Sequence, residues 1–379
     1  MSEWKKCPIG EVVTLRQGFA INAKSKHYMS KEETSLPLLR IADMKNGTKE
    51  VFVKEEIPQR FIAHPEDIIY TRTGNVGLVF RNNYGVMHNN CFSVTPNDAD
   101  ELSRDFLYYA LQNKTFFDTA NALARGAAQP DLPHTSFNSI EFAYPSLFVQ
   151  ERIAYILSRY DSLIENYQKQ IKLLEEAAQR LYKEWFIDLH FPGHENTNII
   201  DGVPEGWEKK KVGEVIAKVP RSKQIPTKDY QNEGAIPIID QSRDYIAGYT
   251  DDIESRVESN EPYIVFGDHT RILKYVPFPF AKGADGTQLI MSNNLDLMPQ
   301  CLLFTSLVSV DLSNYSYARH FKYLKEEEIL VPTASIANAF SKHVAKWYAK
   351  IQLNREQLRL LTEARDRLLP KLMSGEIEI

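Results

Sequence analysis

The sequence of 379 residues predicts an α+β protein built as an internal repeat, with two globular segments that are each followed by a long helix. Two observations lead to this fold class. Similar short motifs recur in the same order roughly 200 residues apart. Near the end of each half, apolar side chains recur at alternating steps of four and three residues, which is the pattern of a coiled coil. We therefore expect the two helices to pack on each other as an antiparallel coiled coil between the two pseudo-repeated globular segments.

The repeat is carried by motifs at both ends of each half. Trp4 precedes Ile9-Gly10-Glu11-Val12 by four intervening residues, and Trp207 precedes Val212-Gly213-Glu214-Val215 in the same way. Near the end of each half, Pro145-Ser146 aligns with Pro332-Thr333. A proline followed by Ser or Thr is typical of a strand that ends and a helix that begins. From there the two halves align without a gap at an offset of 187 residues.

The apolar seam of the helices extends over more than four heptads. Of the ten seam positions of the first helix, eight have an apolar counterpart in the second, and Asn354 and Arg365 are the exceptions. A polar residue within a seam fixes the register of a coiled coil at some cost in stability. An ordinary amphipathic helix that caps its own domain is the alternative, and such helices rarely keep strict heptads over this length. The residues expected at the helix contact are Ile153, Leu157, Tyr160, Ile164, Ile171, Leu174 and Leu181 with Phe340, Val344, Trp347, Ile351, Leu358, Leu361 and Leu368.

The domain organisation follows from these landmarks. Short strands separated by turns such as Asn46-Gly47 and Asp285-Gly286 fill the globular segments, and a turn-rich polar stretch joins the two halves. We predict a first globular segment at 1–145, a first helix at 146–190, a linker at 191–206, a second globular segment at 207–332 and a second helix at 333–379.

Composition excludes several classes of protein. Hydrophobic residues make up 43% and charged residues 25%, as in an ordinary globular protein. No apolar run reaches the roughly 18 residues of a membrane span, and the first residues lack the apolar stretch of a secretory signal. The three cysteines lie far apart, which argues against disulfides and a zinc site and favours the cytoplasm. The net charge of −5 does not by itself indicate nucleic-acid binding.

Several motifs together resemble the DNA specificity subunit of type I restriction-modification systems over essentially the whole chain. These motifs are the repeated tryptophan opening, Asp67-Ile68-Ile69-Tyr70-Thr71-Arg72-Thr73-Gly74-Asn75-Val76-Gly77, Gly126-Ala127-Ala128-Gln129-Pro130-Asp131-Leu132, Pro145 with Gln150-Glu151-Arg152-Ile153, and Leu181-Tyr182-Lys183-Glu184-Trp185-Phe186 before a Phe-Pro-Gly linker.

The resemblance implies a non-catalytic subunit of a methyltransferase and endonuclease complex. Each globular segment would be a target-recognition domain that reads one half of a bipartite site in double-stranded DNA. The helices would set the spacing and dock two methyltransferase subunits, which hold S-adenosylmethionine, and through them the restriction and translocase subunits. The chain itself would need no cofactor or metal. Consistent with this, the sequence has no Asn/Asp-Pro-Pro-Tyr/Phe segment of an amino-methyltransferase and no P-loop.

Candidate DNA contacts are polar side chains on loops, because forked donors and acceptors distinguish base edges. In the first segment, the loop Gly126-Ala127-Ala128 has only small residues, which allows close approach of its backbone to DNA. The second segment departs from the family pattern, with Phe266-Gly267-Asp268-His269-Thr270 in place of Tyr70-Thr71-Arg72-Thr73-Gly74. The candidates are Arg40, Arg72, Thr73, Asn75, Arg125 and Gln129 in the first segment and Arg243, His269, Thr270, Arg271, Arg319, His320 and Lys322 in the second.

Two other interpretations stay open at this point. One is the specificity subunit of a related restriction or defence system that is not of type I. The other is a coiled-coil adaptor whose globular segments bind protein. DNA binding with and without a methyltransferase subunit distinguishes the adaptor from a DNA reader.

Overall fold

The computed structural model describes residues 4–315 and 319–379, and the chain divides into two compact units. Unit 1 comprises Met1–Ile164 and Arg359–Ile379, and unit 2 comprises Glu165–Leu358. Each unit combines one globular segment with a stretch of both long helices. The domain boundaries drawn along the sequence stay a prediction, since the compact units divide both helices.

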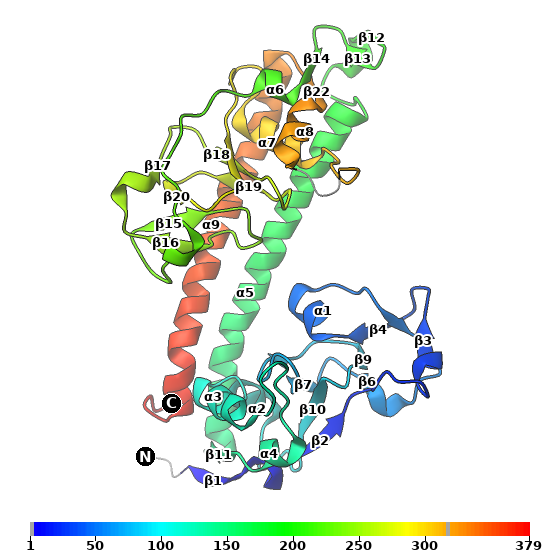
Figure 1. Ribbon diagram of the computed structural model, residues 1–379, viewed down its shortest axis with the longest axis vertical. Helices are drawn as coiled ribbons and strands as arrows, with labels where there is room; N and C mark the ends of the chain where they lie inside the picture. Colours follow the sequence, from blue (N-terminus) through cyan, green and yellow to red (C-terminus); the bar gives the residue numbers. More distant parts are fainter. Residues whose placement is uncertain (1–3, 316–318) are drawn as a thin grey trace. The chain divides into compact units, whose positions relative to one another are not determined.

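The globular part of unit 1 contains one short antiparallel pair and two small sheets (Figure 1). The pair joins β1 (Lys5–Pro8) to β11 (Glu141–Tyr144). One sheet has the strand order β2-β10-β7-β8, with bounds Val13–Gln17, Cys91–Pro96, Ile68–Thr71 and Val79–Phe80. The other has the order β3-β5-β4-β9-β6, with bounds Met29–Ser30, Phe52–Val53, Leu36–Leu39, Gly85–Met87 and Ile62–Ala63. The α-helices are α1 (Ile41–Asn46), α2 (Arg104–Ala110), α3 (Lys114–Leu123) and α4 (His134–Asn138), and short 3-10 turns cover Ile9–Glu11, Lys26–Tyr28 and Gln59–Phe61.

Unit 2 repeats this plan with different lengths. Its pair joins β14 (Glu208–Lys211) to β22 (Glu328–Val331), and a separate small pair joins β12 (Ile199–Ile200) to β13 (Val203–Pro204). One sheet has the order β16-β15-β20-β17, with bounds Gly248–Thr250, Ile236–Ile239, Phe280–Lys282 and Arg256–Val257. The other has the order β19-β18-β21, with bounds Leu273–Val276, Tyr263–Gly267 and Thr287–Ile290. The helices are α6 (Val212–Val215), α7 (Gln300–Val308) and α8 (His320–Glu326), and short 3-10 turns cover His194–Asn196, Thr227–Asp229 and Ile253–Ser255.

The repeat seen in the sequence extends to strand pairing. In unit 1, β4 pairs with β9 in parallel, and β9 pairs with β6 antiparallel. In unit 2, β15 pairs with β20 in parallel, and β20 pairs with β17 antiparallel. The central strands β7 and β18 each have two antiparallel neighbours. The predicted α+β class with two similar globular parts and two long helices is confirmed.

The long helices begin where the proline motifs predict. Helix α5 covers Leu147–Tyr182 and continues as a π-helical turn over Lys183–Ile187, and α9 covers Ala334–Met373. Gln150 in the first turn of α5 is fully buried. Its amide donates to the carbonyls of Glu101 and Pro145, both at 2.9 Å, and accepts from the backbone N–H of Ser103 at 2.8 Å. Buried polar groups need such partners, so Gln150 ties the start of α5 to the globular part of unit 1.

Within each unit, α5 and α9 run antiparallel and contact each other (Figure 1). None of the residues expected at the helix contact is exposed. In unit 1, Ile153, Leu157 and Ile164 are buried, and Leu368 packs on the same core. In unit 2, the buried members are Phe340, Val344 and Ile351. The remaining members, Tyr160, Ile171, Leu174, Leu181, Trp347, Leu358 and Leu361, are partly buried.

The two polar positions of the seam both bond to the opposite helix. In unit 2, the fully buried Asn354 donates to Oε1 of Gln170 at 3.2 Å, while its own Oδ1 has no partner among the described residues. In unit 1, Arg365 donates to Oδ1 of Asp161 at 3.0 Å. These contacts fix which turns of α5 and α9 face each other.

Asp161 also fastens the globular part of unit 1 to the helices. The hydroxyl of Tyr109 donates to its Oδ2 at 2.7 Å, and Arg81 lies 3.4 Å from the same oxygen. The Arg81 guanidinium lies 4.1 Å from the ring centre of Tyr108. Burial, and then the hydrogen bond to Asp161, raise the pKa of Tyr109, so the phenol remains a donor at neutral pH.

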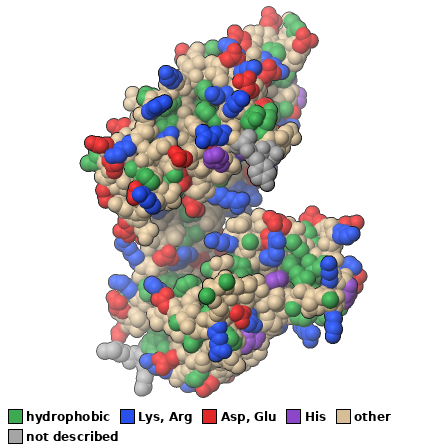
Figure 2. Space-filling model, viewed as in Figure 1, with side chains coloured by type: hydrophobic (Ala, Val, Ile, Leu, Met, Phe, Trp, Pro, Cys, Tyr) green, Lys and Arg blue, Asp and Glu red, His purple; other side chains and the backbone are tan. Residues whose placement is uncertain are grey.

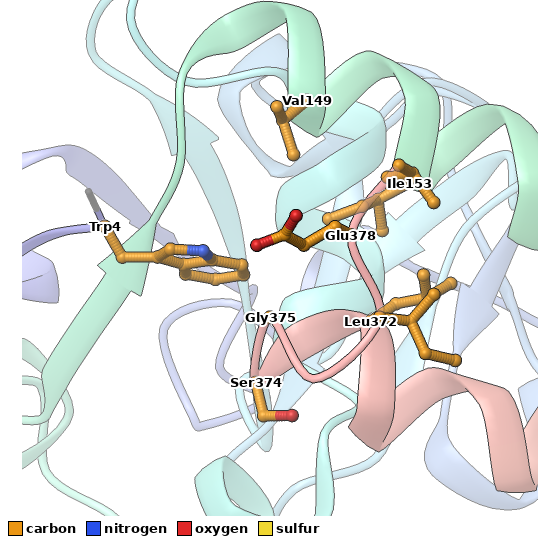
Figure 3. A pocket seen from close by; sticks show the side chains of 9 residues that line it. Trp4, Val149, Ile153, Leu372, Ser374, Gly375 and Glu378 are labelled. Atoms are coloured by element: carbon orange, nitrogen blue, oxygen red, sulfur yellow. The ribbon is translucent and has the colours of Figure 1, made fainter. Parts of the chain in front are cut away.

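The end of α9 returns to the start of the chain within unit 1. Trp4, Val149, Ile153 and Leu372 line a cavity of about 250 Å³, together with the segment that follows α9 (Figure 3). Gly375 has a left-handed backbone conformation with a φ of 73°, and an added Cβ would lie 3.1 Å from the indole nitrogen of Trp4. This close approach lets the chain turn back over the tryptophan.

Replacing Asp161 with Asn should lower the free energy of unfolding by about 2 kcal/mol or more, because two partly buried guanidinium groups lose their shared carboxylate. Urea denaturation of the full chain measures this change. The matched control is Asp105→Asn, since Asp105 lies 3.6 Å from Arg81 but is 74% exposed. The control should cost less than about 0.5 kcal/mol. Equal losses in the two variants would contradict a central role for Asp161.

Replacing Asn354 with Leu should raise the free energy of unfolding by about 1 kcal/mol, because it removes a buried amide whose oxygen lacks a partner. The same denaturation experiment measures this. A loss of more than about 1 kcal/mol would instead mean that the amide contributes net stability through Gln170.

Candidate nucleic-acid interface

Two loops of unit 1 that are far apart in the sequence form one structure. The first, residues 72–77, follows β7, and the second, residues 125–131, precedes α4. The N–H of Gly74 donates to the carbonyl of Pro130 at 2.8 Å, and the N–H of Leu132 donates to that of Arg72 at 2.9 Å. Arg125 and Asp131 exchange two backbone hydrogen bonds of 2.8 Å. We call this pair of loops the paired loop of unit 1.

Asp131 holds the paired loop together. Arg72 donates to both of its carboxylate oxygens, at 3.2 and 2.7 Å, and to Oε1 of Gln17 at 3.2 Å. The hydroxyl of Thr73 donates to Oδ1 of Asp131. Burial opposes ionisation of this carboxyl, but the hydrogen bonds from Arg72 and Thr73 prevail and lower the pKa of Asp131. Arg72 and Thr73, both predicted as DNA contacts, are therefore bonded inside the protein.

Three other predicted residues lie exposed on the paired loop. Asn75, Arg125 and Gln129 are exposed, and the structure gives none of their side chains a hydrogen-bond partner among the described residues. Gly126 has a φ of 97°, and an added Cβ would lie 2.8 Å from the carbonyl oxygen of Gln129. Only glycine fits this bend without strain, so the loop presents its polar side chains from a bare backbone.

Arg40 lies outside the paired loop. It caps the start of α1, where its guanidinium bonds Asp43 at 2.5 and 3.0 Å and Glu50 at 2.6 Å. Burial, and next the charge of Arg40, lower the pKa of His88. The guanidinium of Arg40 is thus bound to two carboxylates. Among the described residues, no hydrogen bond connects Arg40 to Arg125 or Gln129.

In unit 2, the loop after β18 occupies the same place in the fold as the loop after β7. Its first residue, Asp268, is only 4% exposed. One carboxylate oxygen of Asp268 accepts from the N–H of Phe321 at 2.8 Å, and its carbonyl accepts from the N–H of His320 at 2.9 Å. The N–H of Asp268 donates to the carbonyl of Gly286 at 2.7 Å. The strand end is again tied to the start of the helix before the last strand.

His320 takes part in this connection. It is 3% exposed, and its ring nitrogens lie 2.9 Å from the carbonyl oxygen of Asp268 and 2.8 Å from that of Tyr315. The sequence predicts His320 as a DNA contact. In the structure its side chain points into the protein, because both ring nitrogens face main-chain carbonyl oxygens.

The remaining predicted residues of unit 2 are exposed. Thr270 donates to the carbonyl of Gln241 at 2.6 Å, and Arg271 has a φ of 62° with its guanidinium 3.5 Å from the carbonyl of Tyr315. We call residues 268–271 the strand-end loop of unit 2. The exposed candidates are Arg243, His269, Thr270, Arg271, Arg319 and Lys322.

Sequence reasoning missed Asp131, Asp268 and Gln241. Asp131 stood in one of the quoted motifs, but an acidic residue gives no local signal that it bonds an arginine 59 residues away. Gln241 donates to the carbonyl of Asp285 at 2.9 Å and accepts from the N–H of His269 at 3.2 Å, and so supports the strand-end loop.

Other chemistry is sparse in the described part of the chain. No group of three or more His, Cys, Asp or Glu side chains there has the arrangement of a metal site. Among the helices described, none combines the length and the apolar character needed to span a bilayer. Figure 2 shows Lys and Arg side chains interspersed with Asp and Glu on the face drawn, in agreement with the net charge of −5.

Comparisons with known proteins agree with this architecture. A family model described as "Type I restriction modification DNA specificity domain" matches residues 1–176. The type I restriction enzyme MjaIX specificity subunit of Methanocaldococcus jannaschii is 29% identical over 314 residues, which cover 76% of this chain and 72% of that protein. The type I restriction enzyme HindI specificity subunit of Haemophilus influenzae is 21% identical, with full coverage of both chains.

A solved structure shares the fold over nearly the whole length. The S subunit of a type I restriction-modification system from M. genitalium superposes with a TM-score of 0.64 at 18% identity, covering 98% of this chain and 96% of that one. The resemblance expected from the sequence motifs is confirmed. Residues 1–176 thus match the type I restriction modification DNA specificity domain, and over most of its length the chain is similar to specificity subunits, the non-catalytic components of type I systems.

Proposed function

We propose that this chain reads a bipartite DNA sequence for a type I restriction-modification complex in the cytoplasm. The globular part of each unit would bind one half-site, and we call these parts the first and the second reader. The observation that carries the proposal is the repeat itself: each reader places an exposed polar loop at the same strand end, and the two loops have different side chains. Two readers of one fold with different loops suit two different half-sites.

The first reader would contact bases through Arg125, Gln129 and Asn75. Arg forms paired hydrogen bonds with guanine, and Asn or Gln with adenine, in the major groove. The Arg72–Asp131 contact would hold the loop that presents them, because a guanidinium bound to a carboxylate at 2.7 Å is not free to bond a base. This assigns recognition to Arg125 and support to Arg72.

The second reader would use the strand-end loop and its exposed neighbours. His269, Thr270 and Arg271 follow β18, and Arg319 and Lys322 flank the buried His320. Buried contacts of Asp268 and His320 hold the backbone, so that the exposed side chains project from a fixed frame.

The helices would dock the methyltransferase subunits. Large apolar side chains are exposed on them: Phe148, Tyr155 and Leu163 at 65, 66 and 47% in unit 1 and Leu173 at 52% in unit 2. Exposed apolar groups of this kind mark protein interaction sites when they gather on one element. Leu360, exposed at 44%, is the counterpart of Leu173 at the offset of 187 residues, which fits two docked copies. These subunits would bring S-adenosylmethionine and connect to the restriction and translocase subunits.

The net negative charge of the chain suggests that the partner subunits make many of the contacts to the DNA phosphates. Phosphate contacts supply most of the non-specific affinity of DNA-binding proteins. A chain with 45 basic and 50 acidic residues contributes few of these contacts, so the partner subunits would grip much of the DNA backbone. The specificity subunit would then select the sequence.

Reconstitution tests this proposal. The full chain is purified alone and together with its methyltransferase subunits, and methylated positions are mapped on genomic DNA. Methylation at one bipartite sequence should need both components. Methyl transfer by the chain alone, or unchanged methylated sites when the chain is replaced by a relative, would contradict the proposal.

Arg125→Ala should reduce discrimination between cognate and random duplexes by about 1–3 kcal/mol, since the paired contact to a base is lost. Fluorescence anisotropy with the assembled methyltransferase complex measures both affinities. Arg72→Ala is the comparison: it leaves the Asp131 carboxylate without its guanidinium partner, so it should also lower the melting temperature of the chain. Equal losses on cognate and random DNA would mark Arg125 as a phosphate contact.

Lengthening the helix pair should lengthen the spacer of the target. One heptad inserted after Ile164 and another after Leu358, the positions where the two units divide, adds about 10.5 Å to each helix and keeps the seam in phase. That length corresponds to about three base pairs of DNA. Methylation mapping should therefore find the same half-sites about two to four base pairs further apart.

The control inserts four residues at each position, which rotates the seam away from its partner and should weaken binding. An unchanged spacer in the seven-residue variant would show that the helices do not set the distance.

A further inference from the structure

A polar cavity of about 400 Å³ lies in the second reader, beside the ends of its two sheets. Its polar lining consists of Arg221, Ser222 and Gln224 from the segment before β15, Lys282 at the end of β20, and Gln288 in β21. The backbones of Gln224 and Lys282 are adjacent, and the N–H of Ile225 donates to the carbonyl of Lys282 at 3.0 Å. The segment that carries Arg221 is thus attached to the sheet that carries Lys282.

The five polar side chains of the cavity have no hydrogen bond or ion pair to any described residue. The hydroxyl oxygen of Ser222 is buried without a partner. Buried polar groups usually find partners within the protein or in a ligand or water. By contrast, Lys223, the residue after Ser222, bonds Asp252 at 2.7 Å and Glu254 at 3.3 Å. The cavity therefore gathers side chains that lack internal bonds.

The chemistry of the lining favours an anion. Arg and Lys are donors only, and no carboxylate is among the lining residues. Burial lowers the pKa of Lys282, and the charge of the exposed Asp285 counteracts it. A bound anion would stabilise the charged ammonium further. Two cations without carboxylates stand out in a unit whose globular part is acidic overall.

The cavity is linked to the strand-end loop of unit 2. Residues 283–286 connect β20 to β21, so Lys282 and Gln288 lie just before and just after this connection. Its residues Asp285 and Gly286 bond Gln241 and Asp268, which hold the strand-end loop. A group held in the cavity would therefore be positioned relative to His269 and Arg271 through a short path of hydrogen bonds.

We propose that this cavity binds a phosphodiester of the DNA backbone and so sets the position of the second reader on its half-site. The inference rests on the proposed function, since it names a contact of the same reader. Phosphates project from a duplex and are bonded by Arg, Lys, Ser and amide side chains, which are the groups present here. Contacts of this kind fix the register of the protein and carry no sequence information.

A phosphate-by-phosphate binding experiment tests the inference. The assembled methyltransferase complex is titrated with cognate duplexes that each contain one methylphosphonate, which removes a single negative charge. For the wild-type chain, one position near the second half-site should weaken binding about tenfold. The variant Arg221→Gln with Lys282→Gln should weaken binding to unmodified cognate and random DNA by a similar factor. A methylphosphonate at that position should not weaken the binding of this variant any further. The slope of its log affinity against log salt concentration should decrease in magnitude by about one.

The matched control removes the same charge from exposed positions of the same unit that do not line the cavity, with Lys228→Gln and Arg256→Gln. This variant should keep the wild-type sensitivity at the marked phosphate. If the effects of the cavity variant and of the methylphosphonate add at every position, the cavity does not hold a phosphodiester and the inference is overturned.

The experiment also distinguishes binding of a free phosphate compound from failure of the proposed function. Calorimetric titration with inorganic phosphate that saturates in the wild-type chain but not in the cavity variant, together with additive effects on DNA, would assign the cavity to a free phosphate compound and overturn the DNA assignment. Absence of any sequence-specific binding by the wild-type complex would instead contradict the proposed function. Retained specificity with no response to the cavity variant contradicts only the inference.

Discussion

The pairing of α5 with α9 is the contact on which the rest of the molecule depends. The hydrophobic core of unit 1 contains Leu372 and Met373 from the end of α9 beside Ile153 of α5 and Phe142 of β11. The core of unit 2 contains Ala178 and Tyr182 from α5 beside Phe340 and Val344 of α9. Neither globular segment completes its core with its own following helix alone. Each needs a stretch of the helix that belongs to the other half of the chain.

This arrangement explains why polar residues are found in the seam. Asn354 and Arg365 each bond a residue of the opposite helix, and both lie close to the positions where the units divide. An apolar seam tolerates a shift by one heptad, whereas a buried amide and a partly buried charge are satisfied in one register only. Since each core requires particular side chains from both helices, a shift in register would disrupt both cores together.

In both units, the loop after a central strand, β7 or β18, is bonded to the start of a later helix. The charged side chain at the strand end has opposite sign in the two units. In unit 1 a cation at the strand end, Arg72, bonds a carboxylate before α4. In unit 2 a carboxylate at the strand end, Asp268, accepts from the N–H of Phe321 in the first turn of α8, where the helix dipole favours a negative charge. Because the internal bonds hold the backbone, the exposed side chains can differ between the units without loss of the fold.

The sequence by itself determined the repeat, the two long helices, the helix seam and the likeness to type I specificity subunits. These features are periodic or local, so neighbouring residues are enough to reveal them: a heptad is visible within one helix, and a proline before Ser marks a helix start without knowledge of its surroundings. The α+β class followed from the same signals. The identification of Asn354 and Arg365 as polar seam positions was also possible, because an interruption is visible against a regular pattern.

Only the tertiary structure decided what the individual polar side chains do. It joined residues 72–77 to residues 125–131, bonded Arg72 to Asp131, turned His320 into the protein and left Arg125 and Gln129 exposed. It also brought Arg221 and Lys282 to one cavity. An arginine has the same chemistry on a loop whether its partner is a carboxylate, a base or a phosphate. Its role depends on which groups the fold places within about 3 Å, and those groups come from distant parts of the chain.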